Sequence, residues 1–222
     1  MRATRVPVFL PFPSGPPRSD GVHVMKVVRS LAAQHGLLDP KWIDDLSLVE
    51  VSGNGERWWN GLDATSKLRM GMGMAWEQWY LPQVPGVIHQ PGEIQVDGIF
   101  MNIDGESLDV VSTLKGPWFK RVLHEVKVTW KSANTVGELG ERVKGVSPNW
   151  LLETQTKAYA KGKGTDVVYV HMYFVNGDYS YPLRPDLRVW RVEYEQPEID
   201  ETWDRILGHL REAHQQESLG GL

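Results

Sequence analysis

The amino-acid sequence predicts an α/β fold in which a central mixed β-sheet is flanked by helices. Apolar residues recur at helical spacing in several segments of the chain, and alternating or continuous apolar runs typical of strands lie between them. The expected order is helix, several strands, helix, strands, helix, which favours a sheet covered by helices. With 222 residues, 41% of them hydrophobic, the chain can bury the core of one substantial domain.

The first 60 residues are predicted to be an N-terminal extension, packed on or beside a domain that spans residues 61–222. About the first 20 residues are rich in proline and are expected to be extended. Residues 22–33 predict a short helix, because apolar residues recur there at helical spacing.

A longer helix is expected to begin at a cap formed by Asp63 or Thr65 and to end at about Tyr80, with Glu77 at the edge of its apolar stripe. Four strand-like runs follow, at residues 87–89, 93–101, 107–112 and 119–130. A turn is predicted at residues 102–105, which makes Asp104 a turn residue, and Asp109 is expected to be an exposed strand residue.

The run around residues 122–128 alternates, so that His124 points to one face of its strand and Glu125 and Lys127 point to the other. We therefore expect His124 to be a packed or hydrogen-bonded histidine. Ser147 and Pro148 then predict a helix to about residue 160 that carries Gln155 and Tyr159 on one face.

The C-terminal part predicts two further strands and a helix. Residues 165–175 form the first strand, Asn176-Gly177 a hairpin turn, and residues 179–183 or 187–194 the return strand. An amphipathic helix is expected to begin at Pro197.

Composition narrows the classes of function. The chain has no cysteine, so disulfides, iron–sulfur clusters and thiol nucleophiles are ruled out. No apolar run approaches the roughly 18 residues that span a bilayer, and we expect a soluble, cytoplasmic protein without a membrane partner.

The net charge is −4, yet residues 115–163 contain ten basic residues and four acidic ones. A basic middle segment suits a polyanionic ligand, and an ordinary solvated face is the alternative.

Three residues suggest chemistry. Asp97 follows an apolar strand, and Glu125 and Lys127 project from one face of a later one. Two carboxylates on neighbouring strands, completed by a main-chain carbonyl such as that of Val126, would make an oxygen site suited to Mg²⁺. A lysine beside them could act on the attacking water or on the developing charge. A simple ion pair between Glu125 and Lys127 is the alternative.

The order of these elements resembles the PD-(D/E)XK nucleases. A helix carries Glu77, a strand ends at Asp97, another strand carries the E-x-K of residues 125–127, and a helix carries the Q-x-x-x-Y of residues 155–159. The Q-x-x-x-Y motif resembles the branch that contains lambda-type phage exonucleases and RecB-type nuclease domains. The resemblance covers residues 62–175, with Val96 in the place of the signature proline.

This resemblance implies a restriction-endonuclease-like core and a set of site residues. Asp97, Glu125 and the Val126 carbonyl would hold Mg²⁺, for which Mn²⁺ would substitute, and Glu77 could supply a further metal contact. Lys127 and Gln155 would be catalytic. The expected DNA contacts are Tyr159, Lys131, Arg142, Lys144, Lys157 and Lys163.

The implied activity is metal-dependent hydrolysis of DNA, most simply by a phage-type exonuclease that resects DNA ends for recombination or repair in a bacterial cytoplasm. A flap- or branch-specific endonuclease and a catalytically silent DNA-binding or assembly protein are the alternatives. Expected partners are DNA, a single-strand annealing or recombination protein, and further copies of the chain.

Overall fold

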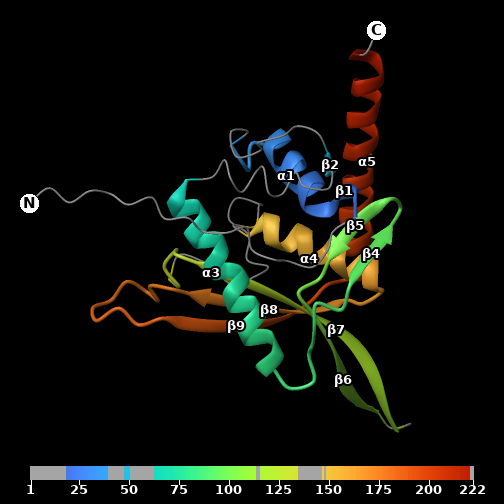
Figure 1. Ribbon diagram of the computed structural model, residues 1–222. Helices are drawn as coiled ribbons and strands as arrows, with labels where there is room; N and C mark the ends of the chain where they lie inside the picture. Colours follow the sequence, from blue (N-terminus) through green and yellow to red (C-terminus); the bar gives the residue numbers. More distant parts are fainter. Residues whose placement is uncertain are drawn as a thin grey trace, which may run out of the picture.

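In the computed structural model, the chain is described at residues 19–39, 48–50, 63–113, 116–134, 147 and 149–220. A five-stranded sheet forms the centre of the fold (Figure 1). Its strands are β3 (Ile88–His89), β6 (Gly105–Thr113), β7 (Gly116–Thr129), β8 (Val167–Phe174) and β9 (Asp186–Glu193), and they lie in that order across the sheet.

The five-stranded sheet is mixed. Strands β7 and β8 are parallel, whereas the other neighbouring pairs are antiparallel. A parallel pair needs a crossover connection, and helix α4 (Trp150–Lys163) lies in the segment between the two strands. The predicted α/β architecture, a mixed sheet flanked by helices, is confirmed.

Helices cover both faces of this sheet. Helix α3 (Ala64–Tyr80) packs on one face, where the ring of Trp76 stacks on that of Tyr173 at 4.1 Å between centroids. As predicted, Asp63 caps this helix, and its Oδ1 accepts hydrogen bonds from the backbone of Thr65 and Ser66. Helix α4 packs on the other face, which we call the site face because it carries Glu125 and Lys127.

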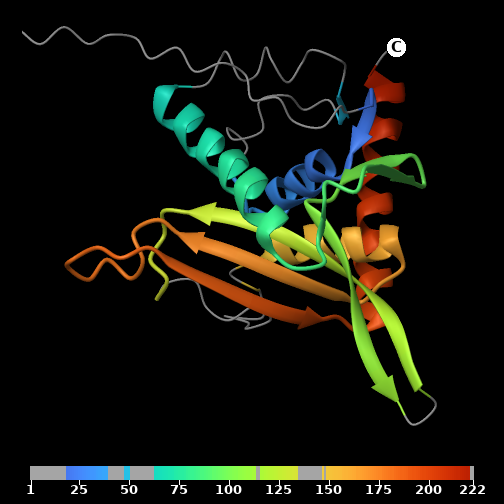
Figure 2. The same ribbon diagram turned by 60° about the horizontal axis from the view of Figure 1, so that its bottom comes forward.

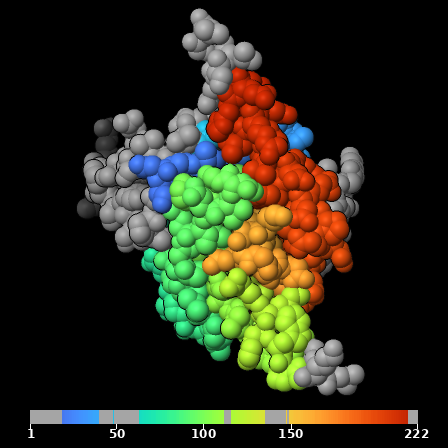
Figure 3. Space-filling model, turned by 90° about the vertical axis from the view of Figure 1, so that its right-hand side faces the viewer, coloured from blue at the N-terminus to red at the C-terminus, as the bar shows by residue number. Residues whose placement is uncertain are grey.

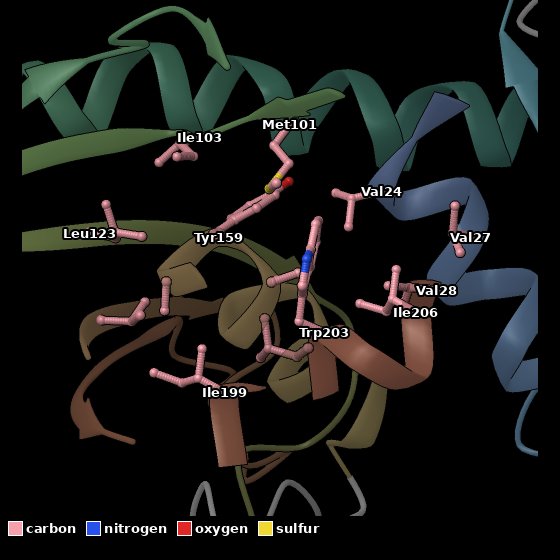
Figure 4. Close-up of a cluster of buried hydrophobic side chains, with 14 of the residues drawn as sticks. Val24, Val27, Val28, Met101, Ile103, Leu123, Tyr159, Ile199, Trp203 and Ile206 are labelled. Carbon is pink, nitrogen blue, oxygen red and sulfur yellow. The ribbon is translucent and has the colours of Figure 1, made fainter. Parts of the chain in front are cut away.

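Helices α1 (Val24–Gln34) and α5 (Gln196–Gly220) complete the layer over the site face. The hydrophobic core lies between these helices, α4 and the sheet, and Figure 4 shows Tyr159 and Trp203 at its centre. The apolar stripe predicted for residues 22–33 accounts for α1, since Val24, Val27 and Val28 are buried. Among the described residues, no helix has the length and apolar composition needed to cross a membrane.

A smaller sheet joins the first part of the chain to the core. It has the order β2 (Val49–Glu50), β1 (Gly21–His23), β5 (Ile99–Asn102) and β4 (Glu93–Val96). Strand β1 pairs in parallel with β5, so this part of the predicted N-terminal extension shares a sheet with the domain that follows it.

The predicted strand at residues 93–101 is a hairpin instead. Asp97 and Gly98 have φ angles of 50° and 82° and form the turn between β4 and β5. Positive φ at both central positions is typical of a type I′ turn, for which Asp-Gly is a preferred pair. The turn predicted at residues 102–105 is not a hairpin either, because the chain there leaves β5 and enters β6 of the larger sheet.

Candidate active site

Glu125 is the centre of the candidate site. It lies on β7 beneath α4, and its side chain is only 1% exposed. Its Oε1 accepts a hydrogen bond from Gln155 Nε2 at 2.8 Å and another from Lys127 Nζ. Its Oε2 is also buried and has no hydrogen-bond partner among the described residues. Burial, assisted by the negative charge of Asp104, raises the pKa of Glu125 to about 7.

Lys127 lies two residues further along β7 on the same face, as the alternation predicts. Its side chain is 38% exposed, so the ammonium group can reach both Glu125 and solvent. Burial alone would lower the pKa of Lys127, but the charges of Glu125 and Asp104 outweigh it, and the pKa is raised. The lysine is therefore held as a cation beside the buried carboxylate.

Gln155 and Tyr159 share one face of α4, as predicted, and this face packs against Glu125. Gln155 Nε2 donates to Tyr159 Oη at 3.0 Å in addition to Glu125 Oε1. Tyr159 is buried in the hydrophobic core (Figure 4). This burial does not favour the direct contact with the DNA backbone that we expected of Tyr159.

Asp97 is not brought to Glu125. It is exposed at the turn between β4 and β5, where its Oδ2 accepts a hydrogen bond from Trp203 Nε1 at 2.8 Å. About 20 Å of extended chain separates this turn from Asp104 at the other end of β5. The expected pairing of Asp97 with Glu125 fails because residue 97 turns a hairpin instead of ending a strand beside β7.

Asp104 takes that position instead. The register of β6 and β7 pairs Gly105 with His124, so the preceding residue, Asp104, meets Glu125. Its Oδ2 accepts a hydrogen bond from the backbone N–H of Val126 at 2.8 Å. The sequence pattern predicts a turn at Asp104 and does not reveal this role. The Asp-Gly pair at residues 97–98 was the available signal, because a hairpin there leaves Asp104 as the next acid to follow a strand.

Glu77 approaches the same region from α3. Its Oε1 accepts hydrogen bonds from Gln90 Nε2 at 3.2 Å and lies 3.3 Å from His89 Nε2. The backbone N–H of Gln90 donates in turn to the carbonyl oxygen of Asp104 at 2.8 Å. Glu77 is thus connected to Asp104 through one intervening residue.

The donor set fits a hard divalent cation. Within the described part of the chain, no group of three or more acidic, histidine or cysteine side chains is gathered for a metal ion. The pair of Asp104 and Glu125 remains, together with the main-chain carbonyl of Val126, which directly follows Glu125 in the sequence. Two adjacent carboxylates with a bare, buried oxygen are unfavourable without a counter-charge, and oxygen ligands of this kind are those that Mg²⁺ and Mn²⁺ bind.

The predicted DNA-binding cations have different surroundings. Lys157 Nζ lies 3.6 Å from a carboxylate oxygen of Glu198, and Lys163 Nζ lies 2.8 Å from one of Glu106. Lys131 is exposed just after the end of β7, whereas Arg142 and Lys144 lie outside the described residues. Arg29 on α1 is a cation that sequence reasoning missed. It is exposed, and its charge acts on Lys127.

His124 lies on the opposite face of β7, hydrogen-bonded and buried, as predicted. Its Nδ1 is 2.9 Å from His171 Nε2, and its Nε2 is 2.8 Å from Ser107 Oγ. Tyr80 Oη lies 3.0 Å from His171 Nδ1 and completes a chain of hydrogen bonds across α3, β8, β7 and β6. Asp109, which we expected to be exposed, is partly buried, with Tyr169 Oη 3.4 Å from its Oδ2.

A cavity of about 650 Å³ lies apart from this cluster. It is lined by residues of α4 and α5, of the segment that follows α1 and of the segment that precedes α4, among them Glu153, Lys157 and Arg205. Neither Asp104 nor Glu125 lines it. The carboxylates, the lysine and the buried amide define the candidate site, because acidic, basic and hydrogen-bonding groups converge there around one buried carboxylate.

Comparisons with known proteins give distant likenesses. No family model and no curated protein matches the chain. Among solved structures, the chain is similar to LHK-Exo, an alkaline exonuclease from Laribacter hongkongensis. With the structure of LHK-Exo in complex with dAMP, the TM-score is 0.48 and the identity is 15%, and the match covers 90% of this chain and 91% of that one. The chain is also similar to a phage-related exonuclease from Haemophilus somnus 129PT, with a TM-score of 0.47, 11% identity, and 89% and 95% of the two chains covered. At this distance the assignment of the site depends on its own geometry.

Proposed function

We propose that the protein is a metal-dependent nuclease that hydrolyses phosphodiester bonds of DNA. The observation that carries this proposal is the buried, unpartnered Oε2 of Glu125 beside Asp104, with Lys127 on the same strand and face. Asp104, Glu125 and the Val126 carbonyl would hold Mg²⁺ or Mn²⁺. When bound, such an ion lowers the pKa of a water ligand and neutralises a phosphate oxygen.

The chain's own residues would then have distinct tasks. Gln155 donates a hydrogen bond to Oε1 of Glu125, and Oε2 has no hydrogen-bond partner among the described residues. Lys127, charged and half-exposed, can donate a hydrogen bond to a phosphate oxygen or to the attacking water, where negative charge develops. The exposed Arg29 adds positive charge on the same side as Lys127 and would attract the phosphate backbone.

Two features favour a nuclease over a DNA-binding protein without turnover. Glu125 hydrogen-bonds Lys127 and Gln155 in the folded chain, and the negative charge of Asp104 acts on it, although such a cluster costs stability. The order of motifs along the sequence supports the same class of enzyme. Within it we favour an exonuclease that acts on DNA ends over an endonuclease for flaps or branches.

The test compares linear, nicked, circular and flapped DNA, end-labelled on each terminus, with Mg²⁺ present. Glu125→Gln and Asp104→Asn should each abolish cleavage, whereas Asp97→Asn is the matched control and should cut like wild type. Its amide oxygen can still accept the hydrogen bond from Trp203. Cleavage retained in Glu125→Gln would remove the proposed function. Loss of cleavage in Asp97→Asn with activity in Asp104→Asn would reverse the choice of aspartate.

A further inference from the structure

The β6–β7 hairpin projects from the body of the protein. We call residues 107–113 and 116–122 the hairpin arm, because pairing between β7 and β8 begins only at Leu123. Figure 2 shows the arm extending away from the helices, and Figure 3 shows it at the lower edge of the molecule, below α4. Among the described strands, none pairs with the outer edges of the arm, and a two-stranded ribbon by itself is only marginally stable.

The arm exposes a patch of apolar side chains on the site face. Val110 and Phe119 are cross-strand partners that are 62% and 64% exposed, and Leu108 is 60% exposed next to them. Phe119 has the same orientation on β7 as Glu125 and Lys127, since the three are separated by even numbers of residues. Six residues of strand place Phe119 about 20 Å from Glu125, which is the length of about six stacked nucleotides.

The charges beside the patch differ between the two faces. On the site face, Arg121 and Lys163 share the single carboxylate of Glu106, which leaves a surplus positive charge, and Arg121 is half-exposed. On the opposite face, Lys120 and Arg191 share the carboxylates of Asp166 and Glu193, and Asp109 lies opposite Lys120 in the register. A polyanion is therefore favoured on the site face only.

Apolar side chains do not bind phosphates, but aromatic ones stack on base faces, which unpaired nucleotides expose along the strand. We infer that the hairpin arm binds unpaired bases of the DNA strand that reaches the active site, with Phe119 as the stacking residue and Arg121 beside it on the backbone. The inference rests on the proposed function for the identity of the polymer. It adds the substrate class, which is DNA with a single-stranded or frayed segment about six nucleotides from the cleaved bond.

The experiment measures binding by fluorescence anisotropy with Ca²⁺ in place of Mg²⁺. The probes are a labelled 20-nucleotide oligothymidylate and a labelled 20-base-pair blunt duplex. Phe119→Ala should weaken binding of the single strand by roughly 5- to 100-fold, which corresponds to the loss of one stacked base, with less than about a twofold effect on the duplex. Phe119→Tyr should bind the single strand like wild type. Val110→Ser, on the partner strand, should weaken single-strand binding less than Phe119→Ala does.

Trp79→Ala is the matched control, because Trp79 is an equally exposed aromatic residue on α3, which packs on the opposite face. It should bind both probes like wild type. Equal affinity of wild type and Phe119→Ala for the single strand would overturn the inference. So would a loss of self-association in Phe119→Ala, measured by light scattering, with unchanged single-strand affinity, because the arm would then contact a second copy. If wild type binds the single strand through Phe119 but cuts no DNA, the inferred role of the hairpin arm would hold and the proposed nuclease activity would be wrong.

Discussion

Gln155 Nε2 lies 2.8 Å from Glu125 Oε1, and this contact joins helix α4 to the central strand of the sheet. Both side chains are buried, so the amide replaces part of the hydration that the carboxylate loses. Gln155 hydrogen-bonds Oε1 of Glu125, whereas Oε2 has no hydrogen-bond partner among the described residues. The geometry of the candidate metal site therefore depends on a residue that would not itself bind the ion.

The first prediction follows from this relationship. Gln155→Ala should weaken Mn²⁺ or Mg²⁺ binding by about 10- to 100-fold, because residues that orient metal ligands typically contribute that much. Isothermal titration calorimetry of the folded protein measures it directly. Gln95→Ala, at an exposed position on β4, is the control. Unchanged metal affinity in Gln155→Ala would mean that its contact with Glu125 serves packing alone.

Tyr159→Phe should have a milder effect. The hydroxyl group accepts one hydrogen bond from Gln155, so its removal should lower the free energy of unfolding by about 0.5–1.5 kcal/mol. Because the ring is buried, DNA affinity should not change. Denaturant unfolding and DNA binding, measured on the same preparation, test both statements. A large loss of DNA affinity at unchanged stability would show that the hydroxyl group does reach the substrate.

Much of this site could be predicted from local patterns, because period-2 alternation fixes the face of a strand and a four-residue spacing fixes the face of a helix. Glu125, Lys127 and Gln155 meet for those reasons. The choice between Asp97 and Asp104 depended on where β4 ends, and an apolar run across residues 93–101 concealed the hairpin. Arg29 and the partners of Lys163 depend on tertiary packing between distant segments, for which one sequence carries no local signal.

Glu125→Gln should raise the stability of the metal-free protein at neutral pH. The pKa of Glu125 rises from an ordinary value of 4.5 to about 7 in the folded state, so folding disfavours the ionised form. The resulting penalty begins above the unfolded pKa of 4.5 and is complete above about pH 7. The melting temperature of wild type should therefore fall relative to that of Glu125→Gln as the pH rises through this range.

Addition of Mg²⁺ at pH 8 should reverse the order. The ion binds the ionised carboxylate and should raise the melting temperature of wild type, but not that of Glu125→Gln. Asp97→Asn should respond to Mg²⁺ like wild type. An equal response of wild type and Glu125→Gln would place the cation elsewhere.

The last prediction concerns acid stability and the contact between His124 and His171. Burial lowers the pKa of each to about 4, from an ordinary value of 6.5. Because the unfolded chain takes up protons first, the stability that these neutral rings contribute is complete above about pH 6.5 and is lost as the pH falls towards 4. Between these two pH values, each histidine should add up to about 1.4 kcal/mol per pH unit to the decrease in the free energy of unfolding.

His171→Gln, whose amide can occupy the place of Nε2 beside His124, removes one of the two titrating rings. It should be less stable than wild type at pH 7.5, but its free energy of unfolding should fall less steeply between pH 6.5 and 4. Urea unfolding across this range measures both slopes, and His35→Asn, at an exposed position, should follow wild type. Parallel curves for wild type and His171→Gln would show that the ring does not titrate between the two states. The acid sensitivity of the fold would then come from its carboxylates.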